Sequence, residues 1–351
     1  MARYTARSLT DLAIKVFEVC GATSDEARCV AEILVESNLM GFDSHGIVRI
    51  PWYVELVRSG KIIPGGEFSV ISKNGGTAVV DCGYNYGQVG ASKAMEVAID
   101  LANDNGISCV VTRRCSHVGR LGTYTTYAAN AGMLGLGFCN SPIEGHFVVP
   151  FGGSEGRLAT NPLSYAAPSN GDPVVLDMST SSISEGEIRV YRNCGEQLPT
   201  ERILDGIGRP STEPNDFYGP PRGSIVPFGG SAGYKATGLA LAVEILAGTL
   251  SGNLITDDSL TGNGICFIVI NVSKLLPEDH FKHLTGELVN YIKSCPSGEG
   301  SDEVFVPGEI EFANKRRLEV EGITIDETTW NHIVECVSSL GISAEEVVSK
   351  T

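Results

Sequence analysis

The chain has few basic residues, no cysteines at metal-binding spacing and no long apolar run, and each absence narrows what it can do. Its 351 residues hold 26 Lys and Arg against 42 Asp and Glu, so the formal net charge is −16. A surface of that sign repels nucleic acid and anionic membranes. Any anionic substrate must therefore be captured by a local group of basic side chains.

The ten cysteines occur singly, with no C-x-x-C pair and no Cys/His spacing of a zinc site. Isolated thiols of this kind are typical of small buried side chains in a reducing compartment. The chain also lacks a signal-peptide core at its start and any stretch of about 18 apolar residues. We expect a cytoplasmic protein with no membrane partner, no nucleic-acid partner and no metal site.

The usual nucleotide-binding sequences are missing too. Neither G-x-x-x-x-G-K-[ST] nor G-x-G-x-x-G occurs in the chain. A dinucleotide site, if there is one, is therefore not built on the usual Rossmann motif.

Two periodicities divide the chain. Apolar residues recur at helical spacing through 8–20, 24–40 and 46–59, with Ser24 as the expected N-cap of the second helix. After these helices, short apolar runs alternate with helical stretches, which is typical of an α/β fold. The expected strands cover 77–83, 107–112, 134–139, 174–178 and 265–272, and the expected helices cover 88–104, 121–132 and 237–250.

These patterns predict two domains. Residues 1–72 form a helical lobe, joined by C-terminal helices in 309–351, and residues 73–308 form a domain that contains the sheet. Within it, residues 192–228 are rich in proline and glycine. Such a segment indicates a long excursion over the surface, either a lid or a subunit contact.

The stretch GFDSHGIVRIPWYVELVRSGK places reactive side chains between two helical patterns. If Asp43 or Ser44 caps the following helix, His45, Arg49 and Tyr53 stack on one side of it at i, i+4 and i+8. An imidazole beside an arginine suits proton transfer on a small 2-oxo or 2-hydroxy acid. The alternative is a capped helix start with a solvated polar face, and spacing alone does not separate the two.

A serine nucleophile with its base is a further possibility at this stretch, since Ser44 and His45 are neighbours. On a helix, adjacent side chains diverge by roughly 100° and do not face each other. This geometry argues against a serine hydrolase.

Three later segments carry polar side chains where a strand ends or a helix begins. His117 follows an apolar strand, where it either transfers a proton or bonds only to backbone. Asp177 lies at the end of another apolar strand and needs a partner, for which an imidazole N–H or the next helix N-terminus would serve. Lys235 stands in a glycine-rich loop before a long helix, as in a phosphate cradle.

Taken in chain order, these segments resemble the type-2 malate/L-lactate dehydrogenase family, whose relatives include ureidoglycolate, sulfolactate and diketogulonate oxidoreductases and piperideine-2-carboxylate reductases. The resemblance extends over nearly the whole chain. It rests on the segments GFDSHGIVRIPWYVELVRSGKI, YGQVGASKAMEVAIDLANDNGI, SHVGRLGTYTTYAANAGMLGLGFCNS, FGGSEGRLATNPLSYAAPS, VVLDMSTS, GYKATGLALAVEILAGTLSG and VPGEIE. It implies hydride transfer between NAD or NADP and C2 of a small 2-hydroxy or 2-oxo acid. It also implies a homodimer and an α/β fold in which a non-Rossmann mixed sheet binds the dinucleotide.

The same resemblance implies roles for single residues. His45 or His117 moves the proton, and Asp177 orients His45. The residues on the substrate side are Ser44, Arg49, Tyr53, Thr160 and Asn161. Those on the cofactor side are His117, Arg120, Asn140, Ser141, Asp177, Met178, Ser179, Thr180, Ser181, Lys235, Pro307, Gly308 and Glu309.

The chain departs from the family pattern at two places. It has CSHVGR where many members have S-N-H-F-G, and GYKATG where many have G-Y-K-G-Y-G. These changes leave open which acid is the substrate and whether NAD or NADP is preferred. An NAD(P)H-dependent reductase of cyclic 2-imino acids is the first alternative, and a non-catalytic nucleotide- or metabolite-binding protein is the second.

Overall fold

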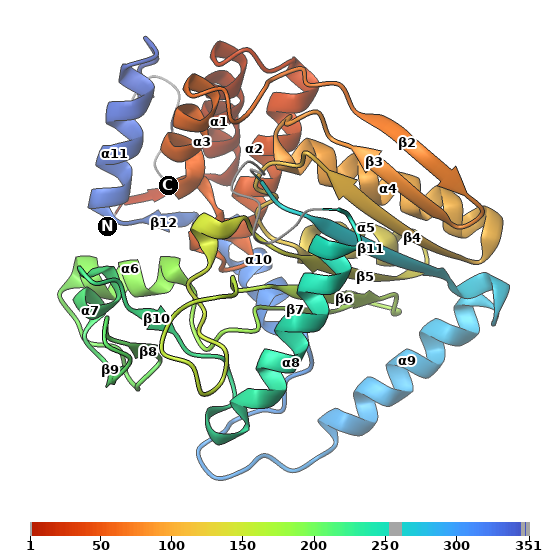
Figure 1. Ribbon diagram of the computed structural model, residues 1–351. Helices are drawn as coiled ribbons and strands as arrows, with labels where there is room; N and C mark the ends of the chain where they lie inside the picture. Colours follow the sequence, from red (N-terminus) through yellow and green to blue (C-terminus); the bar gives the residue numbers. More distant parts are fainter. Residues whose placement is uncertain (1, 253–261, 345–347, 349–351) are drawn as a thin grey trace.

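The computed structural model describes residues 2–252, 262–344 and 348 of the chain. Figure 1 shows a group of helices, coloured red to orange and blue, beside a broad sheet that has helices packed on it. A smaller group of short strands and helices, in green, lies below the first group.

The main sheet has seven strands in the order β2, β3, β4, β11, β5, β6 and β7. They cover Ser69–Asn74 (β2), Thr77–Asp81 (β3), Ile107–Arg113 (β4), Ile265–Asn271 (β11), Met133–Cys139 (β5), Leu163–Ala167 (β6) and Val174–Met178 (β7). β3 and β4 are parallel, and every other neighbouring pair is antiparallel. The expected mixed sheet is confirmed, and it differs from the parallel sheet of a Rossmann domain.

One face of this sheet is covered by α4 (Gly87–Asn105) and α5 (Gly122–Asn130). Glycines in β5 allow α5 to pack closely, since a Cβ on Gly135 would lie 2.8 Å from the Ala128 Cβ. The apolar runs of the sequence correctly predicted β3, β4, β5, β7 and β11. They missed β2, whose residues are all exposed, and the short β6.

The helical group combines both ends of the described chain. It contains α1 (Ala6–Val19), α2 (Ser24–Leu39), α3 (Ile50–Arg58), α10 (Glu309–Glu321) and α11 (Glu327–Ser338), and β1 (Ala2–Tyr4) pairs with β12 (Ile323–Ile325). Leu12, Leu34, Ile323 and Ile333 share one buried core. The N-cap of α2 is Thr23, which forms a capping box with Glu26, so the choice of Ser24 was wrong by one residue.

The proline- and glycine-rich stretch folds into a small unit of its own with the helix before it. α6 (Glu185–Cys194) and α7 (Pro214–Tyr218) accompany a three-stranded sheet of β8 (Ile203–Leu204), β9 (Pro210–Ser211) and β10 (Ser224–Ile225). Ile188 and Phe217 are fully buried in its core. We call residues 184–228 the small unit.

Two helices complete the fold. α8 (Gly233–Val243) continues as a π-helix over Glu244–Thr249, which contacts β5 and β11. α9 (Glu278–Lys293) lies at the lower right of Figure 1 and has no buried residue. Within the described ranges, none of the helices has the length and apolar character needed to cross a membrane.

Candidate active site

The helix expected from residue 45 begins only at Ile50. Two 3-10 turns, Asp43–His45 and Ile47–Arg49, precede it and are separated by Gly46 in an extended conformation. No side chain caps α3, so the predicted cap was wrong. The functional side chains of this stretch are therefore held by turns and not by one continuous helix.

Asn38, at the end of α2, fixes these turns. Its Nδ2 donates to Asp43 Oδ1 at 2.6 Å, and its Oδ1 accepts the backbone N–H of Ile47 at 2.9 Å. A Cβ on Gly46 would overlap the Asn38 side chain, so this close approach requires glycine. Sequence reasoning had not singled out Asn38, because its partners follow it at spacings that no helix or strand period predicts.

The turn also brings Ser44 and His45 together. The Ser44 Oγ lies 3.0 Å from the His45 Nδ1. The expectation that these side chains diverge was wrong, because it assumed a helix. The hydroxyl fixes the orientation of the ring and leaves the Nε2 of His45 as its other polar atom.

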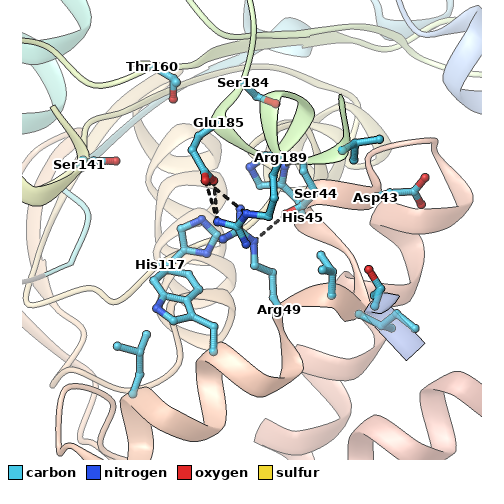
Figure 2. Close-up of a pocket in the computed structure, with 18 of the residues that line it drawn as sticks. Asp43, Ser44, His45, Arg49, His117, Ser141, Thr160, Ser184, Glu185 and Arg189 are labelled. Carbon is cyan, nitrogen blue, oxygen red and sulfur yellow. Dashed lines mark hydrogen bonds and ion pairs between the residues drawn. The ribbon is translucent and has the colours of Figure 1, made fainter. Parts of the chain in front are cut away.

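His45 and His117 come from different elements and meet face to face. Their rings are nearly parallel, with centroids 6.0 Å apart and an interplanar angle of 15°. Both line the same cavity, and Figure 2 shows them side by side. The two histidines that were alternatives for proton transfer are therefore neighbours.

A buried hydrogen-bond chain holds His117 from behind. The Gln88 Nε2 donates to the Tyr53 hydroxyl at 2.7 Å, and the Tyr53 hydroxyl lies 2.7 Å from the His117 Nδ1. Because the Tyr53 oxygen already accepts the amide hydrogen, its own hydrogen is free to be donated to Nδ1. In that arrangement the neutral ring of His117 carries its hydrogen on Nε2. Gln88 was not among the residues expected at the site.

Both imidazoles are neutral at physiological pH. Burial, together with the charges of Arg49 and Arg120, lowers the pKa of His45 to about 3. Burial, with the charges of Arg49 and His45, also lowers the pKa of His117 well below its usual value. A neutral imidazole can accept a proton or donate a hydrogen bond, so the pair can serve both purposes at one oxygen.

Arg49 presents an open edge to the cavity. Its Nε donates to the Ser44 carbonyl at 2.6 Å, and its guanidinium carbon lies 5.2 Å from the Trp52 ring centroid. Within the described part of the chain, neither Nη atom has a hydrogen-bond or ion-pair partner. The side chain is thus oriented from one edge and free to bind a carboxylate with the other.

Asp177 does not contact His45. Its Oδ2 lies 3.2 Å from the Arg120 Nε and accepts the backbone N–H of Gly122 at 2.8 Å. Arg120 in turn lies over the Phe42 ring, at 5.0 Å from its centroid. The imidazole partner expected for Asp177 is instead an arginine, because the loop between β4 and α5 brings Arg120 to the end of β7. Asp177 can act on His45 only through Arg120.

Asn140 and Asn161 both bind a buried carboxylate that sequence reasoning missed. Glu244, at the start of the π-helix, accepts from the Asn140 Nδ2 at 2.7 Å and from the Asn161 Nδ2 at 3.0 Å. Neither asparagine lines the cavity, whereas the next residue, Ser141, and the preceding residue, Thr160, both do. The two asparagines thus join the ends of β5 and β6 to the helix beyond them.

The remaining cofactor-side residues lie elsewhere. Lys235 is exposed beside Tyr234, and Glu309 pairs with Lys293 at 2.7 Å. Of the site residues implied by the family resemblance, those that do not line the described cavity are Tyr53, Arg120, Asn140, Asn161, Asp177, Met178, Ser179, Thr180, Ser181, Lys235, Pro307, Gly308 and Glu309. Those that do line it are Ser44, His45, Arg49, His117, Ser141 and Thr160.

The cavity has a volume of about 1130 Å³ and lies where three parts of the fold meet. The helical group contributes His45 and Arg49, loops at the sheet edge contribute His117 and Ser141, and the small unit contributes Arg189. Figure 2 shows these side chains converging on one space.

Two G-x-S-x-G sequences, at 152–156 and 229–233, bear on the serine-hydrolase alternative. Their serines, Ser154 and Ser231, are exposed and do not line the cavity. Neither therefore has the placement of a nucleophile elbow.

The chain is similar to known proteins over nearly its whole length. The family model described as malate/L-lactate dehydrogenase matches residues 4–334. A relative named L-sulfolactate dehydrogenase, from Methanocaldococcus jannaschii, is 35% identical over 344 residues, which are 96% of this chain and 97% of that protein. The solved malate dehydrogenase of Pyrococcus horikoshii OT3 has a TM-score of 0.88 and 29% identity, covering 97% of this chain and 96% of its own.

A solved structure with a different printed activity is also similar. The Δ1-piperideine-2-carboxylate reductase of Pseudomonas syringae has a TM-score of 0.81 and 26% identity, covering 96% of this chain and 100% of its own. The family match extends over most of the chain and includes every residue that lines the cavity. The chain therefore belongs to the malate/L-lactate dehydrogenase family.

Proposed function

We propose that this protein transfers a hydride between NAD or NADP and C2 of a small 2-hydroxy or 2-oxo acid. The observation that carries this proposal is the open Nη edge of Arg49 beside two neutral imidazoles in one cavity. A carboxylate on that edge would place the neighbouring C2 oxygen next to the rings. Positioning of this kind supplies a large part of enzymatic rate enhancement.

The residues present fit a nicotinamide cofactor. The cavity of about 1130 Å³ is larger than the roughly 300–1,000 Å³ of most small-molecule pockets, so it has room for a dinucleotide beside a small acid. Ser141 and Thr160 offer hydroxyls in its wall, and the buried Oδ1 of Asn161 has no hydrogen-bond partner within the described residues. We propose Ser141 and Thr160 for the nicotinamide side, because Asn161 is buried behind Thr160 and does not itself line the cavity. When bound, the cofactor supplies or accepts the hydride at C2.

We assign different tasks to the two histidines. His45 accepts the proton of the C2 hydroxyl at Nε2 during oxidation, and Ser44 holds its Nδ1. His117 donates a hydrogen bond from Nε2 to the same oxygen, because Tyr53 and Gln88 keep the hydrogen off its Nδ1. In the direction of reduction this donor polarises the carbonyl, and His45 returns the proton.

A substrate panel tests the proposal. We would measure nicotinamide absorbance at about 340 nm with 2-hydroxy and 2-oxo acids and with both NAD(H) and NADP(H). Turnover of at least one acid is expected, and the same panel decides between NAD and NADP. Dinucleotide binding without turnover of any acid would favour the non-catalytic alternative.

A cyclic 2-imino acid is the second candidate substrate, favoured by the likeness to the piperideine-2-carboxylate reductase. Such a substrate carries a carboxylate next to its C=N bond, so Arg49 would hold it in the same way. Adding piperideine-2-carboxylate and NAD(P)H to the panel separates the candidates. A much higher kcat/KM for the imine than for every 2-oxo acid would replace the first proposal.

We further propose that the protein acts as a homodimer. α9 has no buried residue, and it exposes Leu288 at 58% and Tyr291 at 78%. Apolar side chains gathered on one helix favour burial against a partner. Sedimentation equilibrium should give twice the chain mass of 37.2 kDa. A mass of one chain at micromolar concentration would contradict the dimer.

A further inference from the structure

Arg189 is a second arginine in the cavity, and it comes from a different part of the fold than Arg49. It lies on α6 of the small unit, whereas Arg49 precedes α3 of the helical group. Figure 2 shows Glu185 and Arg189 pointing from α6 into the space that Arg49 enters from the opposite wall. Burial is the main cause that lowers the pKa of Arg49, and the nearby charge of Arg189 adds to it. The two guanidinium groups are thus within electrostatic range of each other.

Glu185 holds Arg189 by one edge only. The Arg189 Nη2 donates to both carboxylate oxygens of Glu185 at 2.8 Å, and its Nε donates to Oε1 at 3.3 Å. The Tyr218 hydroxyl steadies the same carboxylate at 2.9 Å. These hydrogen bonds to Glu185 leave the Nη1 of Arg189 unused, and the Tyr218 side chain also interacts with the guanidinium. A guanidinium fixed in this way keeps a preorganised edge for a second anion.

The exposure of Glu185 and Arg189 supports a role for Glu185 in holding Arg189 and a role for Arg189 in binding an anion. The side chain of Glu185 is 18% exposed, whereas that of Arg189 is 51% exposed. The carboxylate is therefore turned toward the protein and the guanidinium toward the open space. The ion pair of Arg157 and Glu155 shows both groups to solvent, at 67% and 71%. The pair of Arg114 and Asp81 has the same uneven exposure as Arg189 and Glu185, at 53% and 14%, but it lies outside the cavity.

We propose that Arg189 binds a second anionic group of the substrate and selects acids that carry a carboxylate or sulfonate beyond C2. This inference rests on the proposed function, in which Arg49 holds the C1 carboxylate. A substrate with one carboxylate makes no use of the free edge of Arg189. A dianion instead spans the cavity between Arg49 and Arg189, and so joins the helical group to the small unit. In a chain of net charge −16, a dianion needs two such local cations.

The experiment compares Arg189→Gln with the unmodified protein on oxaloacetate and on pyruvate, with the preferred nicotinamide cofactor. Loss of a charge-assisted contact should lower kcat/KM for oxaloacetate by about 10- to 100-fold. The value for pyruvate should stay within about threefold, because no contact is lost. Arg157→Gln is the matched control, since it removes an equal charge from an ion pair outside the cavity. Arg189→Lys should recover only part of the oxaloacetate activity, because a point charge replaces the fork.

Two results would overturn the inference: equal losses on the two acids in Arg189→Gln, or an unmodified protein that prefers pyruvate. If no acid is turned over, the proposed function is wrong. The affinity for acids that carry one or two carboxylates then tests the role of Arg189. Calorimetry would compare malonate with acetate for the unmodified protein and for Arg189→Gln. Tighter malonate binding that disappears in the variant supports the inference, and equal affinities in the two proteins contradict it.

Discussion

The Tyr53 hydroxyl lies 2.7 Å from the His117 Nδ1, although the two residues are 64 positions apart in the chain. Tyr53 is fully buried, and burial raises its pKa to about 12. The hydroxyl therefore keeps its hydrogen over the whole range in which an enzyme is assayed. It can act as a permanent donor that decides which nitrogen of His117 is protonated.

Tyr53→Phe should release that constraint. Without the hydroxyl, the His117 hydrogen can move to Nδ1, and the Nε2 that faces the substrate is no longer always a donor. We expect kcat to fall by about 10- to 100-fold while the KM for the acid changes little. Steady-state kinetics with the best acid of the panel measures both. Gln88→Leu, which removes the donor behind Tyr53, should lower kcat by a smaller factor. An unchanged kcat in both variants would show that the hydrogen bonds from Gln88 through Tyr53 to His117 play no part in the mechanism.

His45→Gln and His117→Gln should lower turnover to different extents, because the two histidines have different proposed roles. Loss of the base in His45→Gln should reduce turnover by about 10²- to 10⁴-fold. In His117→Gln the amide can still donate a hydrogen bond to the substrate oxygen, so the loss should be smaller. Parallel assays over a range of pH distinguish the two. A larger loss of turnover in His117→Gln than in His45→Gln would assign the proton transfer to His117.

The depressed pKa of His45 makes stability depend on pH. The unfolded chain binds a proton on this ring below its usual pKa of 6.5, whereas the folded protein does so only below about 3. The unfolded state therefore binds more protons in that window, and the free energy of unfolding falls as the pH drops from 6.5 toward 3. Above pH 6.5 the ring is neutral in both the folded and the unfolded state, so burial of His45 costs no free energy of ionisation there.

Urea unfolding at two pH values within and above this window tests the point. As the pH is lowered, the free energy of unfolding should fall less in His45→Gln than in the unmodified protein. His283→Gln is the control, since His283 is exposed on α9. If His45→Gln shows the same pH dependence as this control, His45 does not carry the effect.

Arg49→Lys should weaken substrate binding. A lysine keeps the charge, but it loses the bond to the Ser44 carbonyl, the contact with Trp52 and the two-pronged edge. We expect the KM for the acid to rise by at least about tenfold. Arg58→Lys, on the exposed end of α3, makes the same change outside the cavity. Similar KM values in the two variants would exclude Arg49 from carboxylate binding.

Asp177 should matter for stability through Arg120. The Arg120 side chain is 3% exposed, so Asp177→Ala leaves a buried charge without its partner. Breaking a buried pair of this kind costs about 3–5 kcal/mol. Asp172→Ala removes an exposed partner of Arg316 and should cost at most about 1 kcal/mol. Chemical denaturation measures both, and adding Arg120→Met to Asp177→Ala should recover part of the loss.

Much of the fold could be predicted from local patterns. The strands at 107–113, 133–139 and 265–271 are continuous apolar runs because the sheet interior buries them. β2 could not be found in this way, since an edge strand with every residue exposed has no apolar signature. The start of α3 was misplaced because Gly46 and Asn38 break the helical geometry that the apolar spacing suggested.

For the candidate site, the sequence by itself determined the chemistry available: two histidines, an arginine next to one of them and a polar strand end at Asp177. Residue types and local order are enough for that, because they decide which groups can transfer protons or bind anions. Only the tertiary structure decided the partners. It paired Ser44 with His45, Tyr53 with His117 and Asp177 with Arg120, and it brought Arg189 into the cavity. Such pairings depend on where turns and distant elements place side chains in space, and no periodicity along the chain encodes those distances.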